Sequence, residues 1–158
     1  KVRLDGGFYL PNPPRDSRTF PTESGCANFR VHGLSGTSAG PGRYLMMTIR
    51  SHDQYNTTIY GLDDRYRGIN KGRRVVLMNQ SDMDDNDWSK GDLVDLTSHF
   101  EGTELHAREW YIVPYEIPKG NIATYFPEAN VLVPLDSVAE GSNTPTSKSV
   151  VVTIRATD

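Results

Sequence analysis

The sequence predicts a mainly β protein whose strands close into a barrel, with a few short helices. Strand-like runs of five or six residues are separated by long connections, and helix signals are few. The 14 glycines and 10 prolines mark many turns, and 158 residues are enough to bury a core without disulfides. A layered α/β sheet would need helices between its strands, and the pattern lacks them.

The first 42 residues predict an extended arm, and residues 43–158 are expected to form the barrel. Proline removes a backbone donor and disfavours the helical conformation of the residue before it. One short strand is expected in the arm, at Ala27–Val31. The prolines of the arm are Pro11, Pro13, Pro14, Pro21 and Pro41.

Apolar and β-branched runs beyond the arm predict the strands of the barrel. The first run ends at Ile49, where polar residues follow abruptly. In chain order the predicted strands are Tyr44–Ile49, Arg74–Asn79, Leu93–Thr97, Trp110–Tyr115, Asn121–Tyr125, Ala129–Pro134 and Ser149–Ala156.

Two short helices are expected. Ser81 is a suitable N-cap with a carboxylate, Asp84, three residues later, and this helix is expected to run to about Trp88. Gly91 lies just beyond its expected end. Asp95–Glu101 is a second, weaker helix candidate.

Bulk properties exclude several classes of partner. The formal net charge of −3 argues against non-specific binding of nucleic acid or an anionic membrane. No stretch approaches the roughly 20 apolar residues that span a bilayer, and no signal peptide is visible. Cys26 is the single cysteine, which rules out an internal disulfide and is compatible with a reducing compartment. We therefore expect a cytoplasmic protein. The start at Lys1 rather than Met suggests a piece of a longer chain.

Residues 50–58 are unusually dense in polar groups. They carry one guanidinium, one imidazole, two amides, one phenol and three hydroxyls directly after the first apolar strand. Such a set at a strand end can hold a large hydrogen-bonding ligand. The same composition also fits a solvated loop, and both interpretations stay open at this point.

Two further segments have groups that suit phosphate. Arg65–Arg74 is basic and contains glycines, although Asp63 and Asp64 precede it and a solvated connection would look the same. Thr144–Lys148 places one lysine among hydroxyls, where its ammonium could act as a point charge toward an anion.

The sequence offers neither a metal site nor a catalytic apparatus. The four histidines are scattered without ligand spacing. No Gly-x-Ser-x-Gly elbow is present. The acidic residues between Asp82 and Asp87 lack the alternating ligands and central glycine of an EF-hand loop. We therefore expect neither catalytic nor metal-ligating residues in this chain.

Five local motifs in a fixed order resemble the C-terminal domain of molybdopterin-dinucleotide oxidoreductases, especially formate dehydrogenase-like alpha subunits. The resemblance covers about 130 residues. In two places the chain differs: Cys26 stands where the family usually has lysine, and Arg65–Arg74 belongs to a subgroup. The motifs are Phe20–Phe29, Arg50–Thr58, Val75–Asp82, Gly91–Val94, and Phe126–Leu132 followed by Ser147–Lys148.

The resemblance implies a six-stranded double-psi β-barrel that grips bis(molybdopterin guanine dinucleotide) together with the rest of its subunit. The amides of this chain would suit the pterin edges, and its cations the pyrophosphate. His52 lies between matched positions and is included in the site. The implied cofactor-binding residues are Arg50, His52, Gln54, Tyr55, Asn56, Thr57, Asn130 and Lys148.

The resemblance also implies an enzyme in which molybdenum or tungsten carries out the oxidoreduction in upstream domains. The partners would be those upstream domains and redox partner subunits. The isolated chain is expected to be inactive and to carry no cofactor.

Two other interpretations remain open. A free-standing double-psi barrel could act as an adaptor module, for which Tyr55, Tyr60, Tyr66 and Trp110 supply aromatic anchors. A small β-barrel enzyme without a metal would need an acid, base or nucleophile pair that the sequence does not show.

Overall fold

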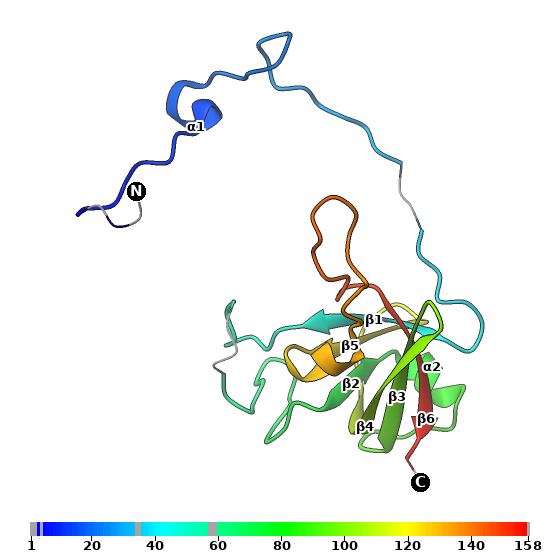
Figure 1. Ribbon diagram of the computed structural model, residues 1–158. Helices are drawn as coiled ribbons and strands as arrows, with labels where there is room; N and C mark the ends of the chain where they lie inside the picture. Colours follow the sequence, from blue (N-terminus) through cyan, green and yellow to red (C-terminus); the bar gives the residue numbers. More distant parts are fainter. Residues whose placement is uncertain (1–2, 4, 34–35, 57–59, 158) are drawn as a thin grey trace. The chain divides into compact units, whose positions relative to one another are not determined.

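The structure, a computed structural model, describes residue 3 and residues 5–33, 36–56 and 60–157. The chain divides into two compact units, Lys1–Gly36 and Thr37–Asp158. Figure 1 shows the helices and strands of each unit.

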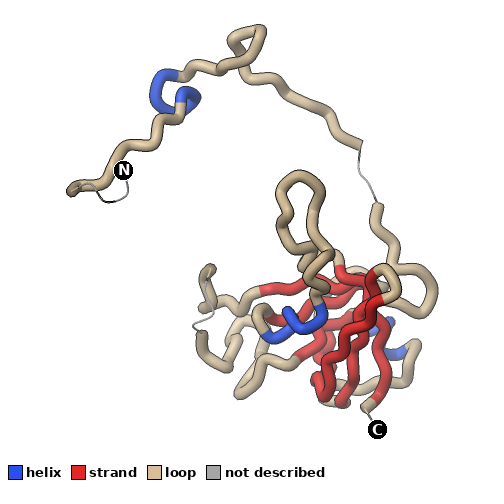
Figure 2. Tube along the Cα trace, in the orientation of Figure 1, coloured by secondary structure: helices blue, strands red, loops and turns tan. Residues whose placement is uncertain are grey.

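The second unit is a closed six-stranded barrel, as far as the described residues show. The strands neighbour one another in the order β1-β5-β2-β4-β3-β6, and Figure 2 shows them gathered in this unit. The predicted fold class, mainly β with a closed barrel and few short helices, is confirmed. The strands are β1 Tyr44–Ile49, β2 Val75–Met78, β3 Leu93–Phe100, β4 Thr103–Pro114, β5 Asn121–Tyr125 and β6 Val150–Ala156.

Two parallel strand pairs give the barrel its topology. β1 runs parallel to β5, and β2 runs parallel to β4, whereas the other neighbouring pairs are antiparallel. Ile49, the last residue of β1, lies opposite Tyr125, the last residue of β5. The chain therefore leaves both strands at the same edge of the barrel.

The main core fills the barrel, and a second cluster covers part of its outside. All four residues of β2 are buried. Because successive side chains of a strand point to opposite faces, Val76 and Met78 join the main core while Val75 and Leu77 join the outer cluster with Ile69. The segment before β2 therefore packs on the barrel wall.

The helices differ from the sequence expectations. Helix α2 spans Gln80–Asp84 and is capped by Asn79, whose side chain accepts from the Ser81 amide, so the predicted N-cap and length were wrong. Asn79 is an equally good cap and lies at the end of β2, where the chain must turn. The weaker helix candidate Asp95–Glu101 was also wrong, because this stretch belongs to β3 and pairs with both β4 and β6.

One predicted strand is a helical turn. Residues predicted as the strand Ala129–Pro134 form the 3-10 helix η1, Glu128–Leu132. Short apolar runs do not distinguish a buried strand from a buried helical turn. Here Ala129 and Leu132, three residues apart, share the buried face, and Leu132 belongs to the main core.

The first unit has a short helix where an extended arm was expected. Helix α1 spans Pro13–Ser17, with Asn12 as its cap and proline in its first turn, where the missing backbone donor is not needed. The expected strand at Ala27–Val31 was wrong: these residues form neither strand nor helix.

No helix among the described residues is long and apolar enough to cross a membrane. The same part of the chain contains no group of three or more His, Cys, Asp or Glu side chains that could hold a metal ion.

Candidate functional site

The parallel pair β1/β5 delivers two polar segments to one edge of the barrel. The amide of Phe126 donates to the carbonyl oxygen of Ile49 over 2.7 Å, which extends the pairing beyond the strands. The next residue after Ile49 is Arg50, and the guanidinium carbon of Arg50 lies 4.9 Å from the centre of the Phe126 ring. A cation above an aromatic face is attracted by the ring quadrupole, so this contact orients Arg50 at the edge.

The long loop between η1 and β6 returns to the same edge. It projects from the strands in orange in Figure 1. The amide of Thr48 donates to the carbonyl oxygen of Ser147 over 2.8 Å. In return, the ammonium of Lys148 donates to the carbonyl oxygen of Thr48. The end of the loop is thereby attached to the end of β1.

These segments enclose a cavity of about 340 Å³. Two cations, one amide and hydroxyl groups line it on the polar side, and Phe126 with residues 133–135 lines it on the apolar side. Its lining residues are Thr48, Arg50, Phe126, Asn130, Val133, Pro134, Leu135, Thr144, Pro145, Ser147 and Lys148.

The two cations of the cavity affect each other electrostatically. Burial of the ammonium and the nearby charge of Arg50 lower the pKa of Lys148 from its ordinary value. Two positive charges in a partly desolvated site favour the binding of an anion, which neutralises both. Arg50 also donates to Asn56 Oδ1 over 2.8 Å, so part of its hydrogen-bonding capacity is already used.

The structure brings together three of the residues that the sequence marked. Arg50, Asn130 and Lys148, from three separate segments, line the one cavity. Asn130 sits in η1, and its backbone amide donates to the carbonyl oxygen of Pro127 over 2.9 Å. We find Ser147 and Thr144 there as well, which sequence reasoning did not include among the binding residues. Their sequence signals were their place in the hydroxyl-rich Thr144–Lys148 segment and, for Ser147, its place in the last family motif.

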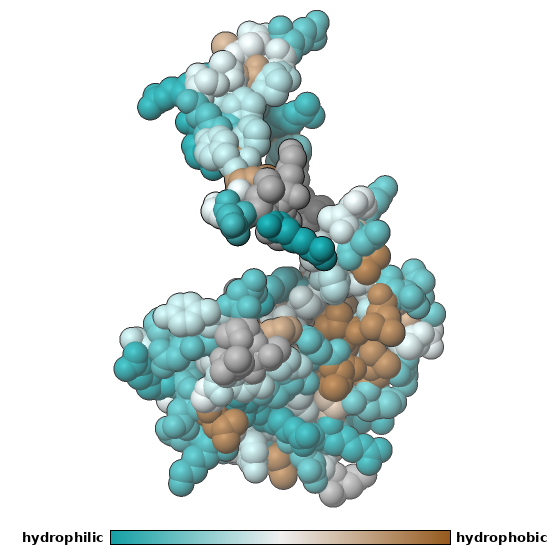
Figure 3. Space-filling view, turned by 60° about the vertical axis from the view of Figure 1, so that its left-hand side comes forward, coloured by the Kyte–Doolittle hydropathy of each residue, from teal (hydrophilic) through white to brown (hydrophobic). Residues whose placement is uncertain are grey.

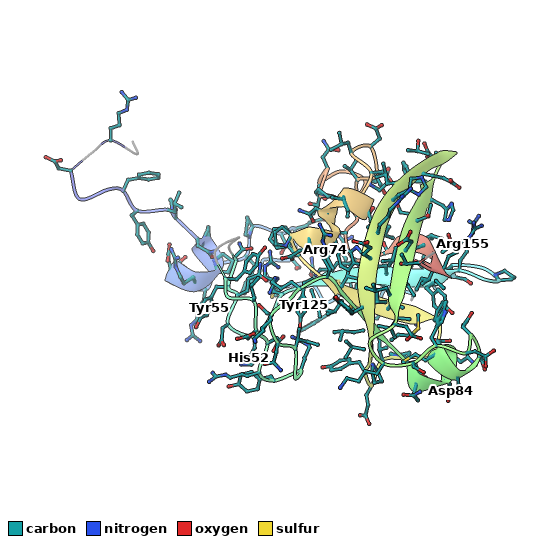
Figure 4. The ribbon with its side chains drawn as sticks, turned by 90° about the horizontal axis from the view of Figure 1, so that it is seen from below. His52, Tyr55, Arg74, Asp84, Tyr125 and Arg155 are labelled. Atoms are coloured by element: carbon teal, nitrogen blue, oxygen red, sulfur yellow. The ribbon has the colours of Figure 1, made fainter. Side chains whose placement is uncertain are left out.

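The remaining marked residues lie elsewhere on the loop after β1. Gln54 is 3% exposed, and its side chain donates to the carbonyl oxygen of Phe126 over 3.0 Å. The His52 ring lies 3.6 Å from the Tyr66 ring, centre to centre. Tyr55 is 82% exposed, and Figure 4 shows His52 and Tyr55 on the loop side of the barrel, away from Asp84 and Arg155. Thr57 lies outside the described residues.

Two arginines of the basic segment before β2, the partly buried Arg67 and the buried Arg73, form hydrogen bonds within the protein. Arg67 donates to Asp64 over 2.6 Å, and Asp64 also accepts from the Tyr125 hydroxyl over 2.8 Å. Arg73 is buried and forms hydrogen bonds to the loop after β1 and to the chain after β5. Its location at the entry of a fully apolar strand was the only sequence signal for a buried role.

The donor set of the cavity is suited to a large anionic ligand with polar edges. Charged donors make the stronger hydrogen bonds to phosphate oxygens. Asn130 can donate and accept at once, as a heterocycle with amide-like edges requires. Phe126 and Val133 supply an apolar wall against which such a heterocycle can pack.

Comparison with known proteins gives a consistent assignment. Residues 44–151 match the family described as the molydopterin dinucleotide binding domain. The chain is 51% identical, over 99% of its length, to Uncharacterized oxidoreductase Rv2900c of Mycobacterium tuberculosis. It is 38% identical, over 96% of its length, to Protein YdeP of Escherichia coli. The chain spans about a fifth of the length of these relatives, 21% in both cases. On the family match over residues 44–151, the chain belongs to the molydopterin dinucleotide binding domain family.

Proposed function

We propose that this chain binds the dinucleotide portion of bis(molybdopterin guanine dinucleotide) within a formate dehydrogenase-like oxidoreductase. The observation that supports this most directly is the cavity lined by Arg50, Asn130 and Lys148. Three polar segments far apart in the sequence supply these side chains, and each had been marked by the family resemblance. When bound in the whole enzyme, the cofactor supplies a redox-active metal held by its pterins.

In this proposal, the residues of this chain bind the cofactor and orient it. Arg50 and Lys148 neutralise the pyrophosphate, and their mutual repulsion is relieved when the anion is present. Asn130 and the hydroxyls of Thr144 and Ser147 bond to the polar edges of the ligand. Phe126 orients Arg50 and excludes water from one side of the cavity. The chain itself transfers neither electrons nor protons.

The rest of the parent protein would supply the reaction. One relative is named an oxidoreductase, and the chain covers only 21% of it, so most of that protein lies outside the matched part. We propose the remaining domains of the same subunit as the partners of this barrel, and the cytoplasm as its compartment.

Exposed apolar side chains next to the cavity support a partner domain. Leu135, which lines the cavity, is 95% exposed, and Val131 in η1 is 57% exposed. Figure 3 shows one larger cluster of hydrophobic residues on the face in view, with smaller hydrophobic areas elsewhere. Exposed apolar residues that cluster near a polar site are typical of surfaces that another domain covers.

The test is isolation of the full-length protein that contains this chain, with analysis for molybdenum, tungsten, pterin and guanine nucleotide. We expect one of the two metals together with pterin and guanine nucleotide. The Arg50→Ala variant should lose about tenfold in cofactor affinity, as expected when a charged hydrogen bond worth about 1.5 kcal/mol is removed. The matched control is Arg155→Ala, an exposed arginine on β6. Equal cofactor content in wild type, Arg50→Ala and Arg155→Ala would contradict the proposed site.

A further inference from the structure

Arg73 is a buried cation with four separate acceptors. Its side chain is 2% exposed. Nε donates to Glu128 over 2.9 Å, and Nη1 donates to the Ser51 hydroxyl over 2.7 Å. Nη2 donates both to Gln54 Oε1, over 2.6 Å, and to the carbonyl oxygen of Phe126, over 2.7 Å.

Two aromatic rings hold the same guanidinium. Its central carbon lies 3.8 Å from the centre of the Tyr60 ring and 4.6 Å from that of the Tyr125 ring. The Tyr60 hydroxyl donates to Glu128 over 2.7 Å, so the carboxylate that pairs with Arg73 is fixed in turn. A buried charge with a paired carboxylate and satisfied donors is a costly arrangement that orders the groups around it.

The acceptors of Arg73 belong to the two sides of the proposed binding site. Ser51 and Gln54 lie on the loop that begins with Arg50. Phe126 lines the cavity itself, and Glu128 opens η1, which carries Asn130. Arg73 itself does not line the cavity. It therefore joins the two segments that present Arg50 and Asn130 without facing the ligand.

We propose that Arg73 is a positioning residue for cofactor binding, which fixes the separation of Arg50 and Asn130 before the ligand arrives. This inference rests on the proposed function of the cavity. Lysine could not replace arginine here, because one ammonium group cannot reach four acceptors spread around a planar fork or stack between two rings. The proposal also assigns a role to the basic segment before β2. Its Arg73 acts by holding the loop after β1 in place and does not contact phosphate.

The first test measures cofactor retention in the full-length protein. Arg73→Gln and Arg73→Lys are each expected to lower cofactor affinity about tenfold, the scale seen when a partner that orients a binding side chain is removed. The matched control is Arg74→Gln, the next residue along, which is exposed and should retain the wild-type content. Wild-type retention in Arg73→Lys would overturn the proposal, because charge alone would then be sufficient.

The second test asks whether Arg73 acts through Arg50. In a double-mutant cycle, a positioning role predicts that Arg50→Ala combined with Arg73→Gln loses less affinity than the product of the two single losses, because the part of the Arg73 effect that acts through Arg50 is then already lost. A purely structural role predicts that the two losses multiply, and that result would overturn the proposal.

The third test needs no cofactor. Hydrogen exchange of the cofactor-free full-length protein should show faster exchange of amides 50–56 in Arg73→Gln than in Arg74→Gln, with β3 and β4 unchanged. Ser51→Ala, which removes one acceptor, is a milder second variant in case Arg73→Gln does not fold, and a smaller change in the same segment is expected. Unchanged exchange of residues 50–56 in both variants would overturn the proposal.

The tests separate failure of this inference from failure of the proposed function. Cofactor loss in Arg50→Ala but not in Arg73→Gln overturns the positioning role alone. Cofactor content that responds to neither variant overturns the proposed binding site, and the positioning role with it.

Discussion

The ammonium of Lys148 donates a hydrogen bond to the carbonyl oxygen of Thr48, 100 residues earlier in the chain. This contact attaches the loop before β6 to the end of β1, and it places Lys148 on the wall of the cavity that Arg50 also lines. The same geometry lowers the pKa of Lys148, through burial and then through the charge of Arg50.

Arg50→Ala should raise the pKa of Lys148 toward its ordinary value. The charge of Arg50 disfavours the protonated ammonium, and its removal takes away that repulsion. The pKa can be followed in the 158-residue chain by the pH dependence of Lys148 acetylation, measured by mass spectrometry. Arg155→Ala should leave the titration of Lys148 as in the wild type. A Lys148 pKa that does not respond to Arg50→Ala would show that the two charges do not interact.

Lys148→Met should lower the cofactor content of the full-length protein. A charged hydrogen bond is worth about 1.5 kcal/mol, or roughly tenfold in affinity. Lys90→Met removes an exposed lysine that does not line this cavity, and it should retain the wild-type content. Metal and guanine nucleotide per protein are the quantities to compare. Equal losses in the two variants would indicate a general charge effect and no specific contact.

Asp64→Asn should make the free energy of unfolding less dependent on pH in the acid range. Burial alone would raise the pKa of Asp64, but hydrogen bonds from Tyr125 and Arg67 and the charge of Arg67 outweigh it, and the pKa lies below its ordinary value. A carboxylate with a depressed folded-state pKa stabilises the fold above its unfolded pKa, and that stability is lost as pH falls through the folded value. At pH 7 we expect a cost of about 2 kcal/mol from the lost charged hydrogen bonds.

The measurement for Asp64→Asn is urea unfolding of the 158-residue chain between about pH 7 and pH 3, the range that brackets an ordinary carboxyl pKa. The difference in free energy of unfolding between wild type and variant should become smaller as the pH falls. Asp136→Asn, at an exposed position, is the control. A difference in free energy of unfolding that stays constant over this pH range would contradict the lowered pKa of Asp64.

Leu132→Ala should destabilise the barrel unit by about 3 kcal/mol, the usual cost of a cavity at a fully buried leucine. Leu132 is 0% exposed, whereas Leu135 on the following loop is 95% exposed. Leu135→Ala should therefore change the free energy of unfolding by less than about 0.5 kcal/mol. Urea unfolding of the 158-residue chain compares the two. Similar effects at both positions would argue against the packing of η1 on the core.

The strands of the barrel could be predicted where the pattern was unambiguous. Tyr44–Ile49 and Asn121–Tyr125 were predicted with the bounds that the structure has. Apolar runs bounded by polar or glycine residues specify such strands locally. The 3-10 helix at Glu128–Leu132 could not be predicted in this way, because its apolar residues fit a strand equally well until Leu132 is seen to enter the core.

The candidate site was predictable in part. The polar character of residues 50–58 and the hydroxyls and lysine of 144–148 are visible in the sequence. Their common location was not visible, since it depends on β1 lying parallel to β5 and on the loop before β6 returning to Thr48. Gln54 illustrates the limit: the resemblance includes it among the cofactor-binding residues, but its burial and the hydrogen bond that it accepts from Arg73 depend on the fold.

The sequence by itself determined the β-rich class, the location of the polar segments and the family to which they point, because these follow from local pattern and residue chemistry. Only the tertiary structure decided which polar side chains face the cavity and which ones hold the loops in place. That division depends on burial and on hydrogen bonds between residues as far apart as Arg73 and Phe126. Such bonds form only when strand pairing has brought the segments together.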